Sequence, residues 1–190
     1  MTDSATYAAP TPAPDAFGAA PSAQCVKVEF VTDSHRVFGE LRYLGPPRRL
    51  VDTLNSIDSG YITVYGGHVD NAIHPDRACR FEVAQIRRDA IMLAIPCDPG
   101  THHGTTMEAV HKAPVPATIV LPGYEVSGNI YLLPEADAAM TPILSSRHFV
   151  PLTDAAITPS DTGMMTEEPL VIVNLARALF YAPNTRPGSA

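Results

Sequence analysis

Hydrophobic and polar residues alternate in several short stretches of the chain, starting at Val26. Val26, Val28 and Phe30 fall on one side of an extended backbone. Lys27 and Glu29 fall on the other side. Because the side chains of a strand point to opposite faces with a period of two, this stretch is predicted to be a half-buried strand.

The first half of the chain is predicted to contain five such strands and one helical turn. A turn at residues 32–35 leads into a second alternating stretch that contains Gly39. Leu50, Val51 and Leu54 have helical spacing, which indicates a short helical turn. The remaining strands are predicted at residues 61–65, 81–87 and 90–95, and Pro96 ends the unit.

The same pattern recurs in the second half of the chain. Setting HRVFGELRYL beside YEVSGNIYLL aligns Gly39 with Gly128, and the last strands align Pro96 with Pro183. We therefore infer an internal duplication. The predicted organisation is a first unit at residues 25–96, a linker at 97–112, a second unit at 113–183 and a tail at 184–190.

The size of each unit points to a bent or closed sheet. A sheet in a unit of about 70 residues cannot bury both of its faces, and a small barrel is the usual solution. Gly39 and Gly128 are predicted to lie mid-strand, where the missing side chain permits a sharp bend or a close backbone approach. The predicted fold class is therefore all-β, with two tandem five-stranded small barrels.

This order of strands resembles the Sm-like small barrel, whose second motif has an Ile-Arg-Gly step followed by an apolar strand. Gly39 matches the glycine of the family's second strand. The phrases HRVFGEL, RRLVDTLN and FVPLTDAAI are also similar to a bacterial Sm-like domain family without an assigned activity. The residues that match the second motif are Ile86, Arg87, Arg88, Ile91 and Ile95.

Departures from the family pattern limit what the resemblance implies. Arg88 stands where the family has glycine, and the second unit has Asn174 and Leu175 at the positions of Arg87 and Arg88. No Asp-x-Asn set precedes the third strand, so the family's base-binding pocket is not carried over. The family's tendency to form rings through edge strands is carried over, because strand edges pair through the backbone.

Composition and charge narrow the possible partners. Charged residues make up 17% of the 190 residues, below the roughly 25% of ordinary soluble domains, which indicates surface buried against other chains. The net charge of −7 argues against phosphate-dominated binding of long nucleic acids. No run of about 18 apolar residues occurs, so no membrane span is predicted.

Residues 1–24 differ in composition from the rest of the chain. They are rich in Ala and Pro and contain only two charged residues, so a disordered arm is expected. They lack the basic start and apolar core of a signal peptide, so a cytoplasmic location is expected. The three cysteines Cys25, Cys79 and Cys97 cannot all pair within one chain, which argues against a disulfide-built scaffold.

Two segments concentrate residues that can bind metals. Zinc needs three or four nitrogen, sulfur or oxygen donors, but the spacings here match no standard ligand pair and do not recur in the second unit. Solvated loop histidines are the favoured interpretation, and no metal or other cofactor is expected. The residues are His68, Asp70, His74, Asp76 and Cys79 in one loop, and Cys97, His102, His103 and His111 in or beside the linker.

An enzymatic function has little support in the sequence. The chain has no phosphate loop, nucleophile elbow or HExxH sequence, so we do not expect an enzyme. An acid/base pair assembled in space stays open as an alternative. The carboxylates considered, which are scattered across turns, are Asp52, Asp58, Asp70, Asp76 and Asp89.

Charge is distributed unevenly between the two units. The first has nine Lys and Arg against nine Asp and Glu, whereas the second has only Arg147 and Arg177 against seven acids. One interpretation is a solvated face with weak local ion pairs. The other is that arginines of the first unit meet acids of the second, in the same chain or the next. The candidate interaction residues are Arg48, Arg49, Arg87, Arg88, Glu167 and Glu168.

These observations lead to one expected function and two alternatives. We expect a non-enzymatic, self-assembling scaffold or protein-binding module that forms a homo-oligomer or binds a protein partner. The first alternative is an RNA-binding regulator that uses Arg48, Arg49, Arg87 and Arg88. The second alternative is a metal-dependent enzyme.

Overall fold

The computed structural model describes residues 23–44, 49–57, 59–71, 78–98, 112–144 and 148–184. Within these ranges the protein is built from strands with only short helices, which confirms the predicted all-β class. The disordered arm expected at residues 1–24 lies outside the described residues except at its end, where the first strand already begins at Ala23. Most of the linker expected at residues 97–112 also lies outside them.

The two halves of the chain have the same order of elements. In the first half these are β1 (Ala23–Val31), β2 (His35–Leu44), α1 (Leu50–Ser56), β3 (Tyr61–Asn71), β4 (Cys79–Arg87), the 3-10 turn η2 (Arg88–Ala90) and β5 (Leu93–Pro96). In the second half they are β6 (Ala113–Leu121), β7 (Tyr124–Leu132), α2 (Thr141–Leu144), β8 (Phe149–Pro159), β9 (Thr166–Asn174), the 3-10 turn η4 (Leu175–Arg177) and β10 (Phe180–Pro183).

All ten strands belong to one antiparallel sheet, in the order β10-β6-β7-β8-β9-β5-β1-β2-β3-β4. Each half contributes five neighbouring strands, and the fifth strand of each half pairs with its first strand. β5 also pairs with β9, so it belongs to the sheet of both halves. The sheet is open, so the two closed five-stranded barrels expected from the sequence are not formed: β5 pairs with β9 instead of β4, and β10 lies at an outer edge.

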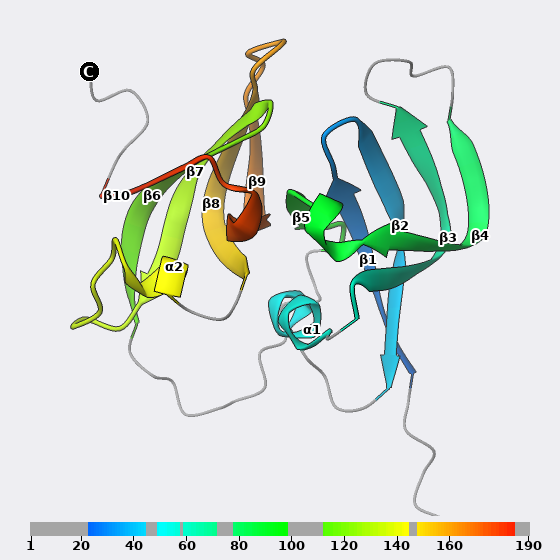
Figure 1. Cartoon of the computed structure of the whole chain (residues 1–190), viewed down its shortest axis with the longest axis horizontal. Coiled ribbons are helices and arrows are strands. Elements are labelled where there is room, and N and C mark those ends of the chain that lie inside the picture. The colour runs from blue at the N-terminus through cyan, green and yellow to red at the C-terminus, as the bar shows by residue number, and fades with distance from the viewer. Residues whose placement is uncertain are drawn as a thin grey trace, which may run out of the picture.

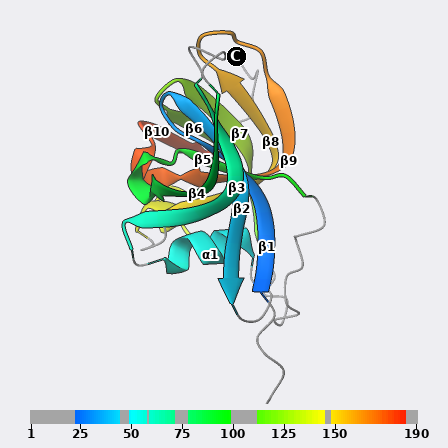
Figure 2. The ribbon, with the colours of Figure 1, turned by 90° about the vertical axis from the view of Figure 1, so that its right-hand side faces the viewer.

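The halves lie side by side, with α1 and α2 toward the same end of the molecule (Figure 1). After a 90° turn, the strands are seen to curve strongly, and α1 lies in the lower part of the view (Figure 2). No helix among the described residues is long and apolar enough to cross a membrane. The 3-10 turn at residues 88–90 replaces the start of the last strand predicted for the first unit, so β5 begins only at Leu93.

The hydrophobic core forms two clusters, and each cluster takes residues from both halves. The cluster around Phe30 and Leu54 of the first half includes Phe149 and Ile172 of the second half. The cluster around Ile119 and Leu152 of the second half includes Val31, Met92, Leu93 and Ile95 of the first half. The two halves therefore share their buried apolar surface and stabilise each other.

Gly39 and Gly128 lie at corresponding irregularities of the sheet. The pairing of β2 with β3 shifts register between Phe38 and Glu40, and that of β7 with β8 shifts between Ser127 and Asn129. A Cβ atom at either glycine would lie within about 3 Å of a backbone carbonyl oxygen of the neighbouring strand. Glycine therefore permits a close approach of backbones at both positions.

Candidate functional site

The most informative site is the joint at which β5 of the first half pairs with β9 of the second. Leu93 lies opposite Val173, and Ala94 lies opposite Ile172. All four residues are fully buried. The backbone N–H of Asn174 donates to the carbonyl of Met92 at 2.9 Å and extends this pairing by one hydrogen bond.

The side chain of Asn174 is buried at the end of the joint. Its amide nitrogen donates to the carbonyls of Ile91 at 2.8 Å and of Arg88 at 3.4 Å. Its amide oxygen accepts from the backbone N–H of Ala176 at 3.1 Å. One side chain thus satisfies backbone groups of both halves, as buried polar groups require.

Three further contacts cross between the halves beside the joint. The guanidinium of Arg177 binds the Asp33 carboxylate at 2.7 and 2.8 Å. Asn55 of α1 donates to the carbonyl of Phe149 at 2.8 Å and accepts from its N–H at 3.1 Å. The guanidinium of Arg88 lies 5.4 Å from the centre of the Phe149 ring, within the range of a cation–π contact.

Among the predicted interaction arginines that the structure describes, Arg88 is the one whose side chain makes a cation–π contact with the second half. Arg49 pairs with Asp52 of its own helix at 2.7 and 3.1 Å, and Arg87 pairs with Asp89 two residues away. Arg48 lies outside the described residues. An ion pair between described residues of the two halves, Arg177 with Asp33, has the reverse polarity to the expected one, with its arginine in the second half.

Glu167 and Glu168 lie on β9, opposite Ala156 and Ala155 of β8. Glu168 influences Glu29 of the first half, whose carboxylate is mostly buried and lies 2.9 Å from Arg36. Burial raises the pKa of Glu29 above its ordinary value of 4.5, and Glu168 adds to the rise, whereas Arg36 opposes it. The second half therefore places a negative charge beside a carboxyl group that is already poorly solvated.

This arrangement predicts that the stability of the protein depends on the ionisation of Glu29. Because its pKa is raised in the folded state, its contribution to stability is complete below its ordinary value of 4.5 and is lost as the pH rises through the raised folded pKa. Glu29→Gln is expected to remove this loss. Urea unfolding of both proteins from pH 4.5 upward measures it. Identical pH dependence in the two proteins would contradict the assignment.

The residues considered for metal binding do not gather where the structure describes them. His68 and Asp70 face each other at 3.6 Å, but no group of three His, Cys, Asp or Glu side chains able to hold a metal is found among the described residues. Cys25, Cys79 and Cys97 are free and exposed. The remaining candidates, His74, Asp76, His102, His103 and His111, lie outside the described residues.

The carboxylates considered for catalysis are likewise dispersed. Asp52 and Asp89 are engaged by Arg49 and Arg87, and Asp70 faces His68. The fifth carboxylate, Asp58, lies outside the described residues, as Asp76 does. Where the structure describes them, these groups form no shared acid/base site.

Large apolar side chains are exposed near the two outer strands of the sheet. Near β10 they are Met140, Ile143, Leu179 and Phe180, and near β4 they are Tyr61 and Val83. These residues were not among the predicted interaction residues. The signal in the sequence is that several of them, such as Ile143, Leu179 and Phe180, are large apolar residues aligned with apolar residues of the first half.

Comparison of the chain with protein-family models, with curated proteins and with solved structures found no match.

Proposed function

We propose that the protein is a self-assembling scaffold in which β10 of one copy pairs with β4 of the next. The observation that carries this proposal is the joint between β5 and β9. β5 and β10 hold the same place in their halves, and so do β9 and β4. A contact between β10 and β4 of two copies would therefore repeat, between chains, the contact that joins the halves of one chain.

The apolar residues at the β10 end match residues that the joint buries. Phe180 and Leu93 are the first residues of their strands, and Leu179 and Met92 are the residues just before them. Leu179 therefore corresponds to Met92, and Phe180 corresponds to Leu93. Met92 and Leu93 are fully buried, whereas Leu179 and Phe180 are 72% and 57% exposed. The N–H groups of Met92 and Leu179 donate to matching carbonyls at 2.8 Å, which supports the correspondence.

The short helix α2 of the second half also exposes a residue whose counterpart in the first half is buried. Ile143 of α2 corresponds to Leu54 of α1 in the alignment of the two halves. α1 packs against β8 across the joint, and Leu54 is fully buried, whereas Ile143 is 58% exposed. The next copy would cover Ile143 with its β3, which corresponds to β8.

At the opposite end, Tyr61 begins β3 as Phe149 begins β8. Phe149 is buried at the joint, whereas Tyr61 is 54% exposed.

Transferring the register of the joint to two copies places Phe180 of one opposite Ile86 of the other, and Tyr181 opposite Gln85. Such a head-to-tail contact uses two different surfaces, so it builds a ring if the rotation closes and a filament if it does not.

The repeated order of elements also supports a proposal about the origin of the two halves. We propose that the two halves are duplicated Sm-like units, each of them a strongly bent open sheet. Their common strand order and the paired glycines at Gly39 and Gly128 support this. Ring formation through edge strands is what the Sm-like resemblance implies.

RNA binding is less well supported, because Asp52 and Asp89 neutralise Arg49 and Arg87.

A proline on β4 tests the proposal through the backbone. The backbone N–H of Asn174 points toward β5. Backbone N–H groups alternate between the two edges of a strand, so the N–H of Ile172, two residues earlier, also points toward β5. The corresponding residues of β4 are Arg87 and Gln85. The N–H of Gln85 is therefore directed away from β3, and proline is tolerated on an edge strand at such a position.

Gln85→Pro is expected to raise the concentration needed for assembly about tenfold or more, because it removes one interchain hydrogen bond and disturbs the pairing register. Gln85→Ser is the matched control, since it also loses the bond from the Gln85 side chain to Thr63 but keeps the backbone N–H. Light scattering across a concentration series measures the mass of the wild type and both variants.

Two outcomes would contradict the proposal. One is a wild-type protein that keeps the single-chain mass of 20.3 kDa at millimolar concentration. The other is an assembly that Gln85→Pro leaves intact while the variant is folded by circular dichroism. In the second case the chain would associate through a surface other than β4.

A further inference from the structure

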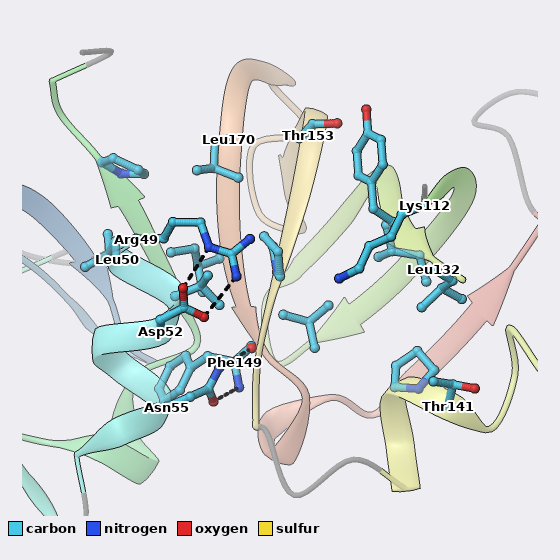
Figure 3. Close-up of a pocket in the computed structure, with 18 residues that line it drawn as sticks. Arg49, Leu50, Asp52, Asn55, Lys112, Leu132, Thr141, Phe149, Thr153 and Leu170 are labelled. Carbon is cyan, nitrogen blue, oxygen red and sulfur yellow. Dashed lines mark hydrogen bonds and ion pairs between the residues drawn. The ribbon is translucent and has the colours of Figure 1, made fainter. Parts of the chain in front are cut away.

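A cavity of about 630 Å³ lies between the two halves, beside the joint. Its walls come from α1 of the first half and from β7, α2, β8 and β9 of the second (Figure 3). This volume is within the range of about 300–1,000 Å³ that is typical of sites for small organic ligands. The cavity lies within a single chain and does not require a second copy.

The inner surface of the cavity is mainly apolar. Ile130, Phe149 and Ile172 are buried residues of the second half that line it, and Leu50 lines it from α1. Leu170, which is half-buried, stands at one side (Figure 3). Such a surface favours a ligand with a hydrophobic body, because burying apolar area is the main source of affinity.

Two cationic side chains reach into the cavity from opposite sides. Arg49 approaches from the start of α1, and Lys112 approaches from the other wall (Figure 3). The bonds of Arg49 to Asp52 use two of the five N–H groups of its guanidinium. Among the described lining residues Asp52 is the single carboxylate, so one positive charge is left uncompensated.

We propose that this cavity binds a small organic carboxylate with an apolar body. The carboxylate would lie between Lys112 and Arg49, and the apolar body would cover Phe149 and Ile172. Hydrogen bonds to charged groups stabilise a complex more than neutral ones do, and the apolar walls strengthen them by reducing competition from water. This inference goes beyond the scaffold function and does not depend on it.

Decanoate is a suitable probe, and 1-decanol has the same chain without the charge. We expect decanoate to bind saturably, and Lys112→Met to weaken it about tenfold by removing one charge-assisted hydrogen bond. The chain contains only two lysines, and the other, Lys27, is exposed and does not line the cavity. Lys27→Met is therefore the matched control and is expected to bind decanoate as the wild type does.

A second variant tests the apolar part of the cavity. Leu170→Trp places a larger side chain at the wall and is expected to abolish decanoate binding. Calorimetric titration measures the affinities, and circular dichroism checks that each variant is folded. Acetylation of lysine amines, followed by mass spectrometry, gives an independent result, because decanoate should protect Lys112 and leave Lys27 reactive.

The proposal is overturned if decanoate does not bind, if Lys112→Met binds it as tightly as the wild type, or if 1-decanol binds equally well. The proposal would also be overturned if a second copy of the chain, without decanoate, already protected Lys112 from acetylation. The Gln85→Pro variant separates this proposal from self-assembly, since it should bind decanoate normally. Loss of assembly with intact binding would support both proposals.

Discussion

Replacing Gly128 with valine is expected to lower the free energy of unfolding by about 1–3 kcal/mol, although valine has a high strand propensity. A Cβ atom at Gly128 would lie 2.9 Å from the carbonyl oxygen of Thr153 and 3.2 Å from Cα of Ala155. These are backbone atoms of β8, which cannot rotate away as the end of a side chain can. Gly39→Val is expected to have a similar effect, because its Cβ would lie 3.0 Å from the carbonyl oxygen of Tyr65.

Gly60 provides the matched control for both substitutions. A Cβ atom there would have no neighbouring atom within 4 Å, and Gly60 is exposed. Gly60→Val should therefore change stability by no more than about 0.5 kcal/mol. Urea unfolding of the four proteins gives the comparison. Equal stability of Gly128→Val and the wild type would show that β7 and β8 are not in close backbone contact.

Replacing Asn174 with leucine is expected to cost about 1–3 kcal/mol, because it leaves buried polar groups without a partner. The carbonyls of Ile91 and Arg88 would lose the amide donor, and the N–H of Ala176 would lose its acceptor. Leucine has the same number and branching of side-chain heavy atoms as asparagine, so the substitution removes the hydrogen bonds without leaving a cavity.

The corresponding control is Asn129→Leu, since Asn129 donates to Asp154 at an exposed site. Its effect should stay within about 0.5 kcal/mol. Hydrogen exchange adds a second measurement, because the N–H of Asn174 crosses the joint to Met92 and should exchange faster in Asn174→Leu. Unchanged stability together with unchanged exchange would mean that the Asn174 side chain does not secure the joint.

Alternation along the chain was sufficient to predict the class of the fold. The stretch from Val26 to Phe30 is a strand in which Val26, Val28 and Phe30 are buried, and β3 and β4 occur where strands were predicted. β3 continues to Asn71, well beyond residue 65, because Gly66 has a positive φ and interrupts the alternation without ending the pairing with β4.

The joint between the halves was not predictable in the same way. Local alternation shows which face of a strand is buried, but it does not show which strands become neighbours. β5 is a short apolar strand whose three leading residues are buried, and this is typical of a strand that is covered on both faces. That signal was present in the sequence, but nothing in it identified β9 as the second partner.

The interaction residues were predicted from charge alone, and local pairing limits such predictions. Asp52 and Asp89 lie three and two residues from the arginines that they bind. Neighbours this close in sequence find each other before distant ones do, because closing a short loop costs less entropy. The uneven distribution of charge between the two halves therefore did not identify the contact of Arg177 with Asp33.

The two partners of β5 have a consequence for how the chain is made. β5 is synthesised about 80 residues before β9, so the ribosome completes the first half while one edge of β5 has no strand beside it. Phe149 and Ile172, which complete the core around Phe30, are also still missing at that stage. The nascent first half thus presents an open strand edge and an incomplete core, and this is the period in which the protein is most exposed to aggregation and to chaperone binding.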